Sequence, residues 1–249
     1  MTTAGQVAGW LVIGLVAGRV ARRAADGDRA RTANRPSPAA GPLAWDGAGI
    51  EAACALILVA VAARSGWGWP AVPYIGLVAT LAAVTITDVR HYRVPDRVLA
   101  AGAAATIPPM AAIGLLADRP ERLAWTAAGA VLLTAPLLAI HLALPHGMGR
   151  GDVKLSILLG AGIGWADPHP LAVDLVRLVL WALVAACALA LVTAAALRVA
   201  GAGAAAGTAG PQPPGRRRTG PPSADRVPFA PALSLATVGV VIAAGPLVR

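Results

Sequence analysis

Charged residues are scarce in this sequence. Only 13% of its 249 residues are Asp, Glu, Lys or Arg, whereas a soluble globular domain carries about 25%. Hydrophobic residues make up 57% of the chain, its mean hydropathy is +0.67, and long apolar runs recur along most of its length. Runs of this kind are buried in lipid. The shortage of charge therefore excludes a soluble domain and predicts a polytopic membrane protein.

Aromatic residues and cysteines are scarce as well. Aromatic residues make up 4% of the chain, and the two cysteines, Cys54 and Cys187, both lie inside apolar runs. So few aromatic side chains exclude a stacking platform for nucleic acid, even though the net charge is +9. The lack of a CxxC pair excludes a zinc site of that type. We therefore expect no nucleic-acid partner, no metal and no organic cofactor.

Eight apolar stretches predict transmembrane helices, because each is rich in Ala, Leu and Val and none alternates like a barrel strand. The predicted fold class is all-α: a membrane helix bundle of about eight transmembrane helices, in a single domain over residues 1–249. Two stretches rich in Ala, Gly, Pro and Arg, at about 22–47 and 200–227, are predicted to be flexible cytoplasmic loops. The predicted spans are residues 5–21, 48–64, 71–87, 97–117, 123–144, 153–166, 171–199 and 228–248.

Positive charge is distributed unevenly between the loops. With eight spans, most of the 21 Lys and Arg residues fall in the loops on one side of the membrane. The positive-inside rule assigns that side to the cytoplasm. Both termini are then predicted on the opposite side of the membrane. The protein is therefore predicted to be an N-out, C-out, multi-pass protein of the cytoplasmic membrane, in contact with lipids.

Three carboxylates lie where apolar helices are predicted to begin or end on the cytoplasmic side. Asp96 follows Pro95 and fits an ordinary N-cap of the fourth span. Asp152 has the same explanation at the sixth span, where its carboxylate would face the free N–H groups of residues 153–155. Asp88 ends the third span, and a helix C-terminus disfavours a carboxylate. Capping therefore explains two of these three residues.

Asp88 and Asp152 are predicted at the same depth on the same side of the membrane. Two carboxyls brought together in a partly desolvated site share a proton. Such a pair can activate water and donate a hydrogen bond to a scissile carbonyl. Gly147, Gly149 and Gly151 precede Asp152 and permit a close approach of backbone to a substrate or a neighbouring helix.

Three segments resemble those of the prepilin peptidase family, also called type IV leader peptidases. These are polytopic aspartyl proteases of the GxGD class, and the resemblance implies that Asp88 and Asp152 are the catalytic residues. Ala230 departs from the family pattern, because Gly is usual at that position. The segments are DVRHYRVPD (88–96), GMGRGDVKLSILLGAGIGW (147–165) and RVPFAPALSLA (226–236).

The resemblance also assigns supporting residues. Lys154 matches a lysine of the motif, and we expect it to support the loop electrostatically or to meet lipid headgroups, with no direct part in catalysis. Gly149 and Gly151 are the glycines of the GxGD motif. The residues expected to be architectural are Pro95, Asp96, Pro228 and Phe229.

Family members differ in their activities. Bifunctional members carry a cytoplasmic zinc-type domain with two CxxC pairs and also methylate the new N-terminus, whereas the corresponding loop here has no cysteine. We therefore predict peptidase activity alone. The implied substrates are type IV prepilin-like precursors (pilins, pseudopilins or tight-adherence pilins), which have a short basic leader before an apolar helix and are cleaved at the cytoplasmic membrane face.

Two other classes of function stay open at the level of sequence. Intramembrane acids can bind ions or relay protons in a transporter or proton channel, although no acid lies near the middle of a predicted span, as a midplane site would need. A non-catalytic membrane scaffold of a pilus or secretion assembly is the other alternative. Leader removal by the wild type but not by aspartate variants would favour the peptidase, and proton uptake without cleavage would favour transport.

Overall fold

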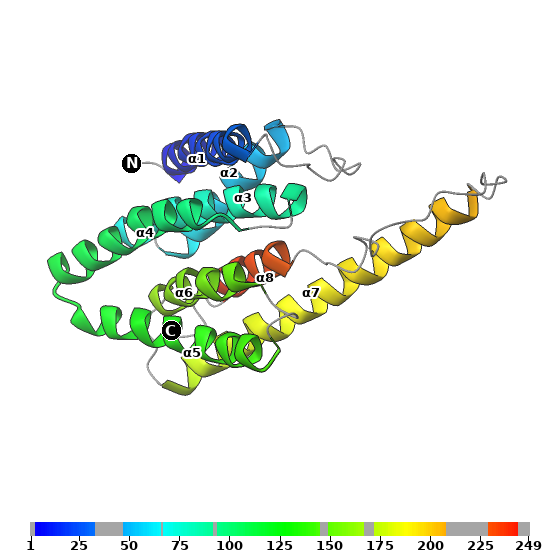
Figure 1. Cartoon of the computed structure of the whole chain (residues 1–249). Helices are drawn as coiled ribbons and strands as arrows, with labels where there is room; N and C mark the ends of the chain where they lie inside the picture. Colours follow the sequence, from blue (N-terminus) through cyan, green and yellow to red (C-terminus); the bar gives the residue numbers. More distant parts are fainter. Residues whose placement is uncertain are drawn as a thin grey trace.

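The computed structural model describes residues 3–32, 47–65, 67–91, 94–144, 149–166, 172–207 and 229–243 (Figure 1). These residues form α-helices and one short 3₁₀ helix, and no strand occurs among them, so the all-α prediction is confirmed. The elements are α1 (Thr3–Thr32), α2 (Gly47–Arg64), η1 (Trp69–Ala71), α3 (Pro73–His91), α4 (Asp96–Leu116), α5 (Pro120–Ala143), α6 (Arg150–Trp165), α7 (Ala172–Gly207) and α8 (Phe229–Ala243).

Each predicted span corresponds to one helix, but two predicted loops begin later than expected. α1 continues to Thr32 and α7 to Gly207, so the first part of each proposed loop is helical. Both extensions are rich in Ala and contain no proline, and Ala has the highest helix propensity. The rest of these loops, residues 33–46 and 208–228, lies outside the described residues.

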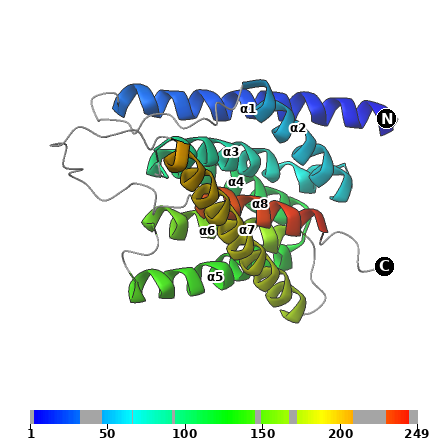
Figure 2. The same cartoon turned by 90° about the vertical axis from the view of Figure 1, so that its right-hand side faces the viewer.

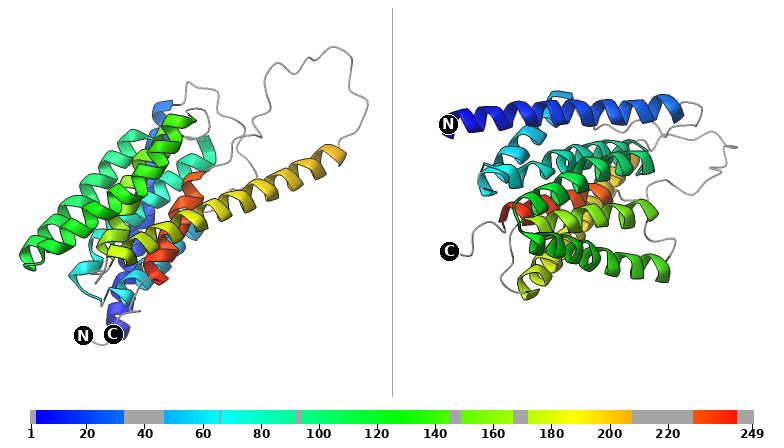
Figure 3. Two further views of the ribbon diagram at one scale, coloured as in Figure 1. Left: turned by 90° about the horizontal axis from the view of Figure 1, so that it is seen from below. Right: turned by 90° about the vertical axis from the view of Figure 1, so that its left-hand side faces the viewer.

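The helices form a layered bundle (Figures 1 and 2). α1 and α2 pack together on one side, α3 and α4 form the next pair, and α6 and α8 lie between that pair and α5. α7 packs against α5, α6 and α8 through its first part. Its remaining turns extend away from the bundle, as Figure 3 shows.

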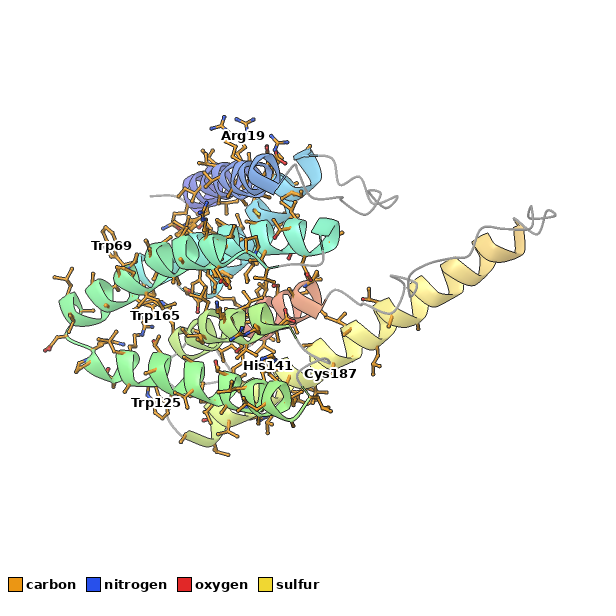
Figure 4. The ribbon with its side chains drawn as sticks, in the orientation of Figure 1. Arg19, Trp69, Trp125, His141, Trp165 and Cys187 are labelled. Atoms are coloured by element: carbon orange, nitrogen blue, oxygen red, sulfur yellow. The ribbon has the colours of Figure 1, made fainter. Side chains whose placement is uncertain are left out.

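α6 is the central helix. It contacts α3, α4, α5, α7 and α8, and every residue from Leu158 to Trp165 is buried. At its end, the Trp165 indole donates a hydrogen bond to the Pro70 carbonyl, and the Arg122 guanidinium lies 5.1 Å from the ring centroid (Figure 4). Sixteen residues rise only about 24 Å, less than a bilayer core of about 30 Å. Neighbouring helices enclose this short helix on most sides.

Glycines set the distance between α5 and α6. A Cβ atom at Gly129 would overlap the Gly160 carbonyl oxygen, and one at Gly164 would overlap the Trp125 carbonyl oxygen. Gly160 and Gly164 are four residues apart and therefore lie on one face of α6, as in the small-residue seams of membrane helix pairs. The backbones of α5 and α6 touch because these positions carry no side chain.

Within the described residues, five helical segments are long and apolar enough to cross a membrane, and Ala230–Ala243 is a shorter apolar helix. Large apolar side chains such as Val16, Leu116 and Leu191 are exposed on the outside of the bundle, where lipid rather than water accounts for them. The count of eight spans and the N-out, C-out orientation stay predictions. The five segments are residues Thr3–Gly27, Trp69–Val89, Asp96–Leu116, Pro120–Ala143 and Ala172–Ala196.

Candidate active site

Asp88 lies on the last turn of α3. The helix runs one turn beyond the predicted span and ends at His91, which keeps Asp88 on the face that packs into the bundle. Only 7% of Asp88 is exposed. Its Oδ2 atom is buried and accepts no hydrogen bond from any residue that the structure describes. One carboxylate oxygen is therefore unused by the part of the chain that the structure describes.

The first turn of α8 supplies a hydrogen bond to this carboxylate. The backbone N–H of Ala230 donates to Asp88, and Ala230 is the second residue of α8 and completely buried. The N-terminus of a helix carries partial positive charge and free N–H groups. α8 is thus a third element of the site.

Asp152 lies in the first turn of α6, where Gly149 is the N-cap. Its carboxylate accepts a hydrogen bond from the backbone N–H of Gly149, as the acidic member of a capping box does. The predicted capping of residues 153–155 is therefore wrong. Asp152 is already inside the helix, and its side chain reaches back toward the N-cap.

Asp152 precedes the apolar run that begins at Val153, and it is half-buried. Burial raises the pKa of the Asp152 carboxyl to about 6, against the opposing effect of the Gly149 N–H. Desolvation penalises the charged form, whereas a hydrogen bond to the carboxylate favours it.

The two aspartates interact electrostatically. The negative charge of Asp152 acts on the Asp88 carboxyl, although the residues belong to different helices. Two carboxyls that are partly or fully buried and coupled in this way hold one shared proton more readily than two negative charges. The arrangement can therefore bring one ionised and one protonated carboxyl to the same bound molecule.

Val94 and Gly151 join the segments that carry the two aspartates. A Cβ atom on Gly151 would lie 2.6 Å from the Val94 Cβ, closer than real side chains approach. Only glycine therefore lets α6 begin at this distance from the connection between α3 and α4. Gly149 has more room, since a Cβ there would lie 3.2 Å from the Asp152 Oδ2 atom.

An ion pair joins the same segments at the surface. The Lys154 Nζ atom lies 2.7 Å from the Asp96 Oδ1 atom, and both side chains are exposed. Exposed pairs contribute up to about 1 kcal/mol, so this pair aligns the segments without dominating stability. The prediction that Asp96 is an N-cap is wrong, because Pro95 occupies that position and Asp96 is the first residue of α4.

Other predicted site residues lie at the edge of this arrangement. Pro95 is buried, and its carbonyl accepts hydrogen bonds from the N–H groups of Val98 and Leu99, which starts α4. Phe229 is the first residue of α8. Gly147 and Pro228 lie outside the described residues.

Residues 75–195 match the model of the type IV leader peptidase family. This part of the chain is therefore similar to that family. The searches of curated proteins and of solved structures found no match. The leader peptidase match indicates a peptidase, and together with the apolar helices it indicates an integral membrane protein.

The leader peptidase segment contains both aspartates, Gly149, Gly151 and Lys154, whereas α8 lies outside it. Sequence reasoning treated the start of α8 as architectural and missed the donor at Ala230. The available signal was Pro228, because proline directly before a helix marks its N-terminus and thus a set of free N–H groups. Among the described residues, no group of three or more His, Cys, Asp or Glu side chains could hold a metal ion.

Proposed function

We propose that this protein is a membrane aspartyl endopeptidase that removes the leader peptide of type IV prepilin-like precursors at the cytoplasmic face of the membrane. The observation that carries the proposal is the electrostatic coupling of Asp88 and Asp152, two acids buried to different degrees at helix ends. Their position within the segment that matches the leader peptidase family supports it.

The chemistry follows from one proton shared between two carboxyls. The ionised carboxylate removes a proton from a water molecule, and the water oxygen bonds to the scissile carbonyl carbon. The protonated carboxyl donates a hydrogen bond and then its proton to the carbonyl oxygen as the tetrahedral intermediate forms. The carbon–nitrogen bond then breaks, and the amine leaves with the proton that the first aspartate took from water. The carboxyl that lost its proton regains it as the carbonyl re-forms.

Backbone donors keep both carboxyls in place during these steps. The Ala230 N–H holds Asp88, and the Gly149 N–H holds Asp152. Hydrogen bonds to charged groups are stronger than neutral ones, so each donor resists protonation of its carboxylate. The coupling between the two carboxylates acts in the opposite direction and favours one shared proton. The unused Oδ2 atom of Asp88 is available to bind the attacking water or the substrate.

The location of the pair fits the cleavage of a precursor near a membrane surface. Asp88 is at the end of α3 and Asp152 at the beginning of α6, so neither lies near the middle of a helix. In the predicted orientation both ends face the cytoplasm. In such a precursor the basic leader stays in the cytoplasm and the apolar helix lies in the membrane. The scissile peptide bond between leader and helix then lies at the cytoplasmic surface of the membrane, near the two aspartates.

Co-expression with a candidate prepilin tests the proposal. Asp88→Asn and Asp152→Asn keep the size of each side chain but remove the acid, and each is expected to slow leader removal by at least about a thousandfold. Cleavage is measured by gel shift and by N-terminal sequencing of the product. The matched control is Asp174→Asn at the start of α7, a half-buried acid on another helix that should leave cleavage unchanged.

The outcomes separate the candidate functions. If both asparagine variants process the precursor as well as the wild type, the two-aspartate mechanism is wrong. Proton uptake by the reconstituted wild type without any cleavage would instead favour a transporter.

A further inference from the structure

An apolar groove leads away from Asp88. It has a volume of about 200 Å³ and lies between α2, α3 and α8. Its lining includes Val89 and Pro231, the residues that directly follow Asp88 and its hydrogen-bond donor Ala230. The groove therefore begins at the level of the catalytic pair.

The groove runs deeper along all three helices. On α3 its lining extends from Val89 back to Val78, which is about 16 Å of helix. On α8 it extends from Pro231 to Val238, and on α2 it includes residues from Ile50 to Ile57. This length matches roughly three turns of a helix. The lining is almost entirely apolar, which suits a hydrophobic segment of polypeptide.

Two hydroxyl groups lie one helical turn below the aspartate. Thr85 precedes Asp88 by three residues and Ser234 follows Ala230 by four, so each shares a helix face with the residue above it. The Ser234 Oγ atom is buried and has no hydrogen-bond partner among the described residues. A buried hydroxyl without a partner is costly in an apolar setting, so this donor is available to a ligand in the groove.

The side of the groove is accessible from outside the bundle. Leu235 lines the groove and is 59% exposed, and Ala53 on α2 lines it and is also exposed. A segment already in the membrane can reach this surface without crossing water.

We propose that the groove between α2, α3 and α8 binds the apolar helix of the precursor, directly after the scissile bond, and that Ser234 pairs with its backbone. This inference rests on the proposed peptidase function. A peptide bond must be extended for hydrolysis, and the adjacent residues then lose helical hydrogen bonds. Their backbone groups need partners in apolar surroundings, and the hydroxyls of Ser234 and Thr85 lie at that level.

Filling the groove tests the inference. Ala53→Trp places a large side chain in the groove, whereas Ala52→Trp places the same side chain on the neighbouring exposed position outside it. For the full precursor, Ala53→Trp should lower kcat/KM at least about tenfold, and Ala52→Trp should not. For a short peptide that ends before the apolar helix, both variants should match the wild type.

Cross-linking provides a readout that does not depend on cleavage. In an Asp152→Asn background with both native cysteines replaced, Leu235→Cys should form a disulfide with a single cysteine in the apolar helix of the precursor. Leu180→Cys, an exposed position on α7, should not. Equal cleavage of the full precursor by wild type and Ala53→Trp, or cross-linking of Leu235→Cys only to a second copy of the chain, would overturn the inference. If the wild type fails to cleave any precursor, the proposed function itself is wrong.

Discussion

The two aspartates of the site accept hydrogen bonds from different backbone donors. Asp152 is held by the N-cap of its own helix, whereas Asp88 is held by the first turn of α8. The local donor on Asp152 can be removed without changing either aspartate side chain. The Gly149 N–H therefore offers a direct test of how backbone groups set the ionisation of the pair.

Gly149→Pro removes this N–H, and the φ angle of −70° at Gly149 suits proline. The donor stabilises the ionised carboxylate, so its loss raises the pKa of Asp152 further above about 6. Fewer molecules then carry an ionised carboxyl at a given acidic pH. The acidic limb of the pH–rate profile for precursor cleavage should move up by about one pH unit.

Gly149→Ala is the matched control for this prediction. It retains the N–H and adds only a Cβ atom, 3.2 Å from the Asp152 Oδ2 atom, which a small adjustment accommodates. Its acidic limb should coincide with that of the wild type. Equal profiles for Gly149→Pro and Gly149→Ala would show that the hydrogen bond does not set the pKa of Asp152.

At the scale of elements, α6 links the end of the bundle that carries the two aspartates to the opposite end. Asp152 is in its first turn, Gly160 and Gly164 pack against α5, and Trp165 closes its last turn against Pro70. The helix is short but almost fully enclosed. Its position therefore depends on backbone contact with α5, and this contact fixes where Asp152 lies relative to α3.

Gly164→Ala should destabilise the protein, because the added Cβ atom would overlap the backbone of Trp125. Helices packed at backbone contact have no flexible side chain that can move aside, so we expect a loss of at least about 2 kcal/mol in the free energy of unfolding. Thermal unfolding in detergent micelles measures it.

The control substitution has the opposite expectation. Gly239→Ala is inside α8, where an added Cβ atom meets nothing within 4 Å. It should be neutral or stabilise the helix by about 0.5–1 kcal/mol. Similar unfolding temperatures for the two alanine variants would contradict the proposed role of the α5–α6 seam.

At the scale of the whole molecule, the outward surface of the bundle is apolar. Exposed Leu116 and Leu191 lie among many exposed apolar residues, while the Lys154–Asp96 ion pair lies where α6 and α4 begin. This distribution fits a bundle inserted in a bilayer. It also makes the predicted orientation testable with single cysteines.

In a background without native cysteines, Arg119→Cys should react with a membrane-impermeant maleimide in intact cells, because it lies between α4 and α5 on the predicted outer side. Arg97→Cys, at the beginning of α4, should react only after the cells are permeabilised. Both positions are exposed, so accessibility within the protein does not separate them. Labelling of Arg97→Cys alone in intact cells would reverse the predicted topology.

The sequence by itself determined the helices and the resemblance to a family. Long apolar runs leave the backbone no alternative to helix in lipid, so each predicted span was recovered as a helix, with differences only at the ends. The motif segments around Asp88 and Asp152 were sufficient to indicate the type IV leader peptidase family, which the family match bears out. The catalytic roles of these two residues stay predictions that the aspartate variants test.

Only the tertiary structure decided which groups surround the aspartates. The Ala230 donor, the contact of Val94 with Gly151 and the pairing of Lys154 with Asp96 each join segments that are distant in the chain. A local sequence pattern predicts which face of a helix is buried, but it does not predict which other helix that face will contact. The packing of α3, α6 and α8 selects those neighbours, and it depends on small residues of several helices at once: a Cβ atom on Gly162 of α6, for example, would overlap the Leu77 side chain of α3.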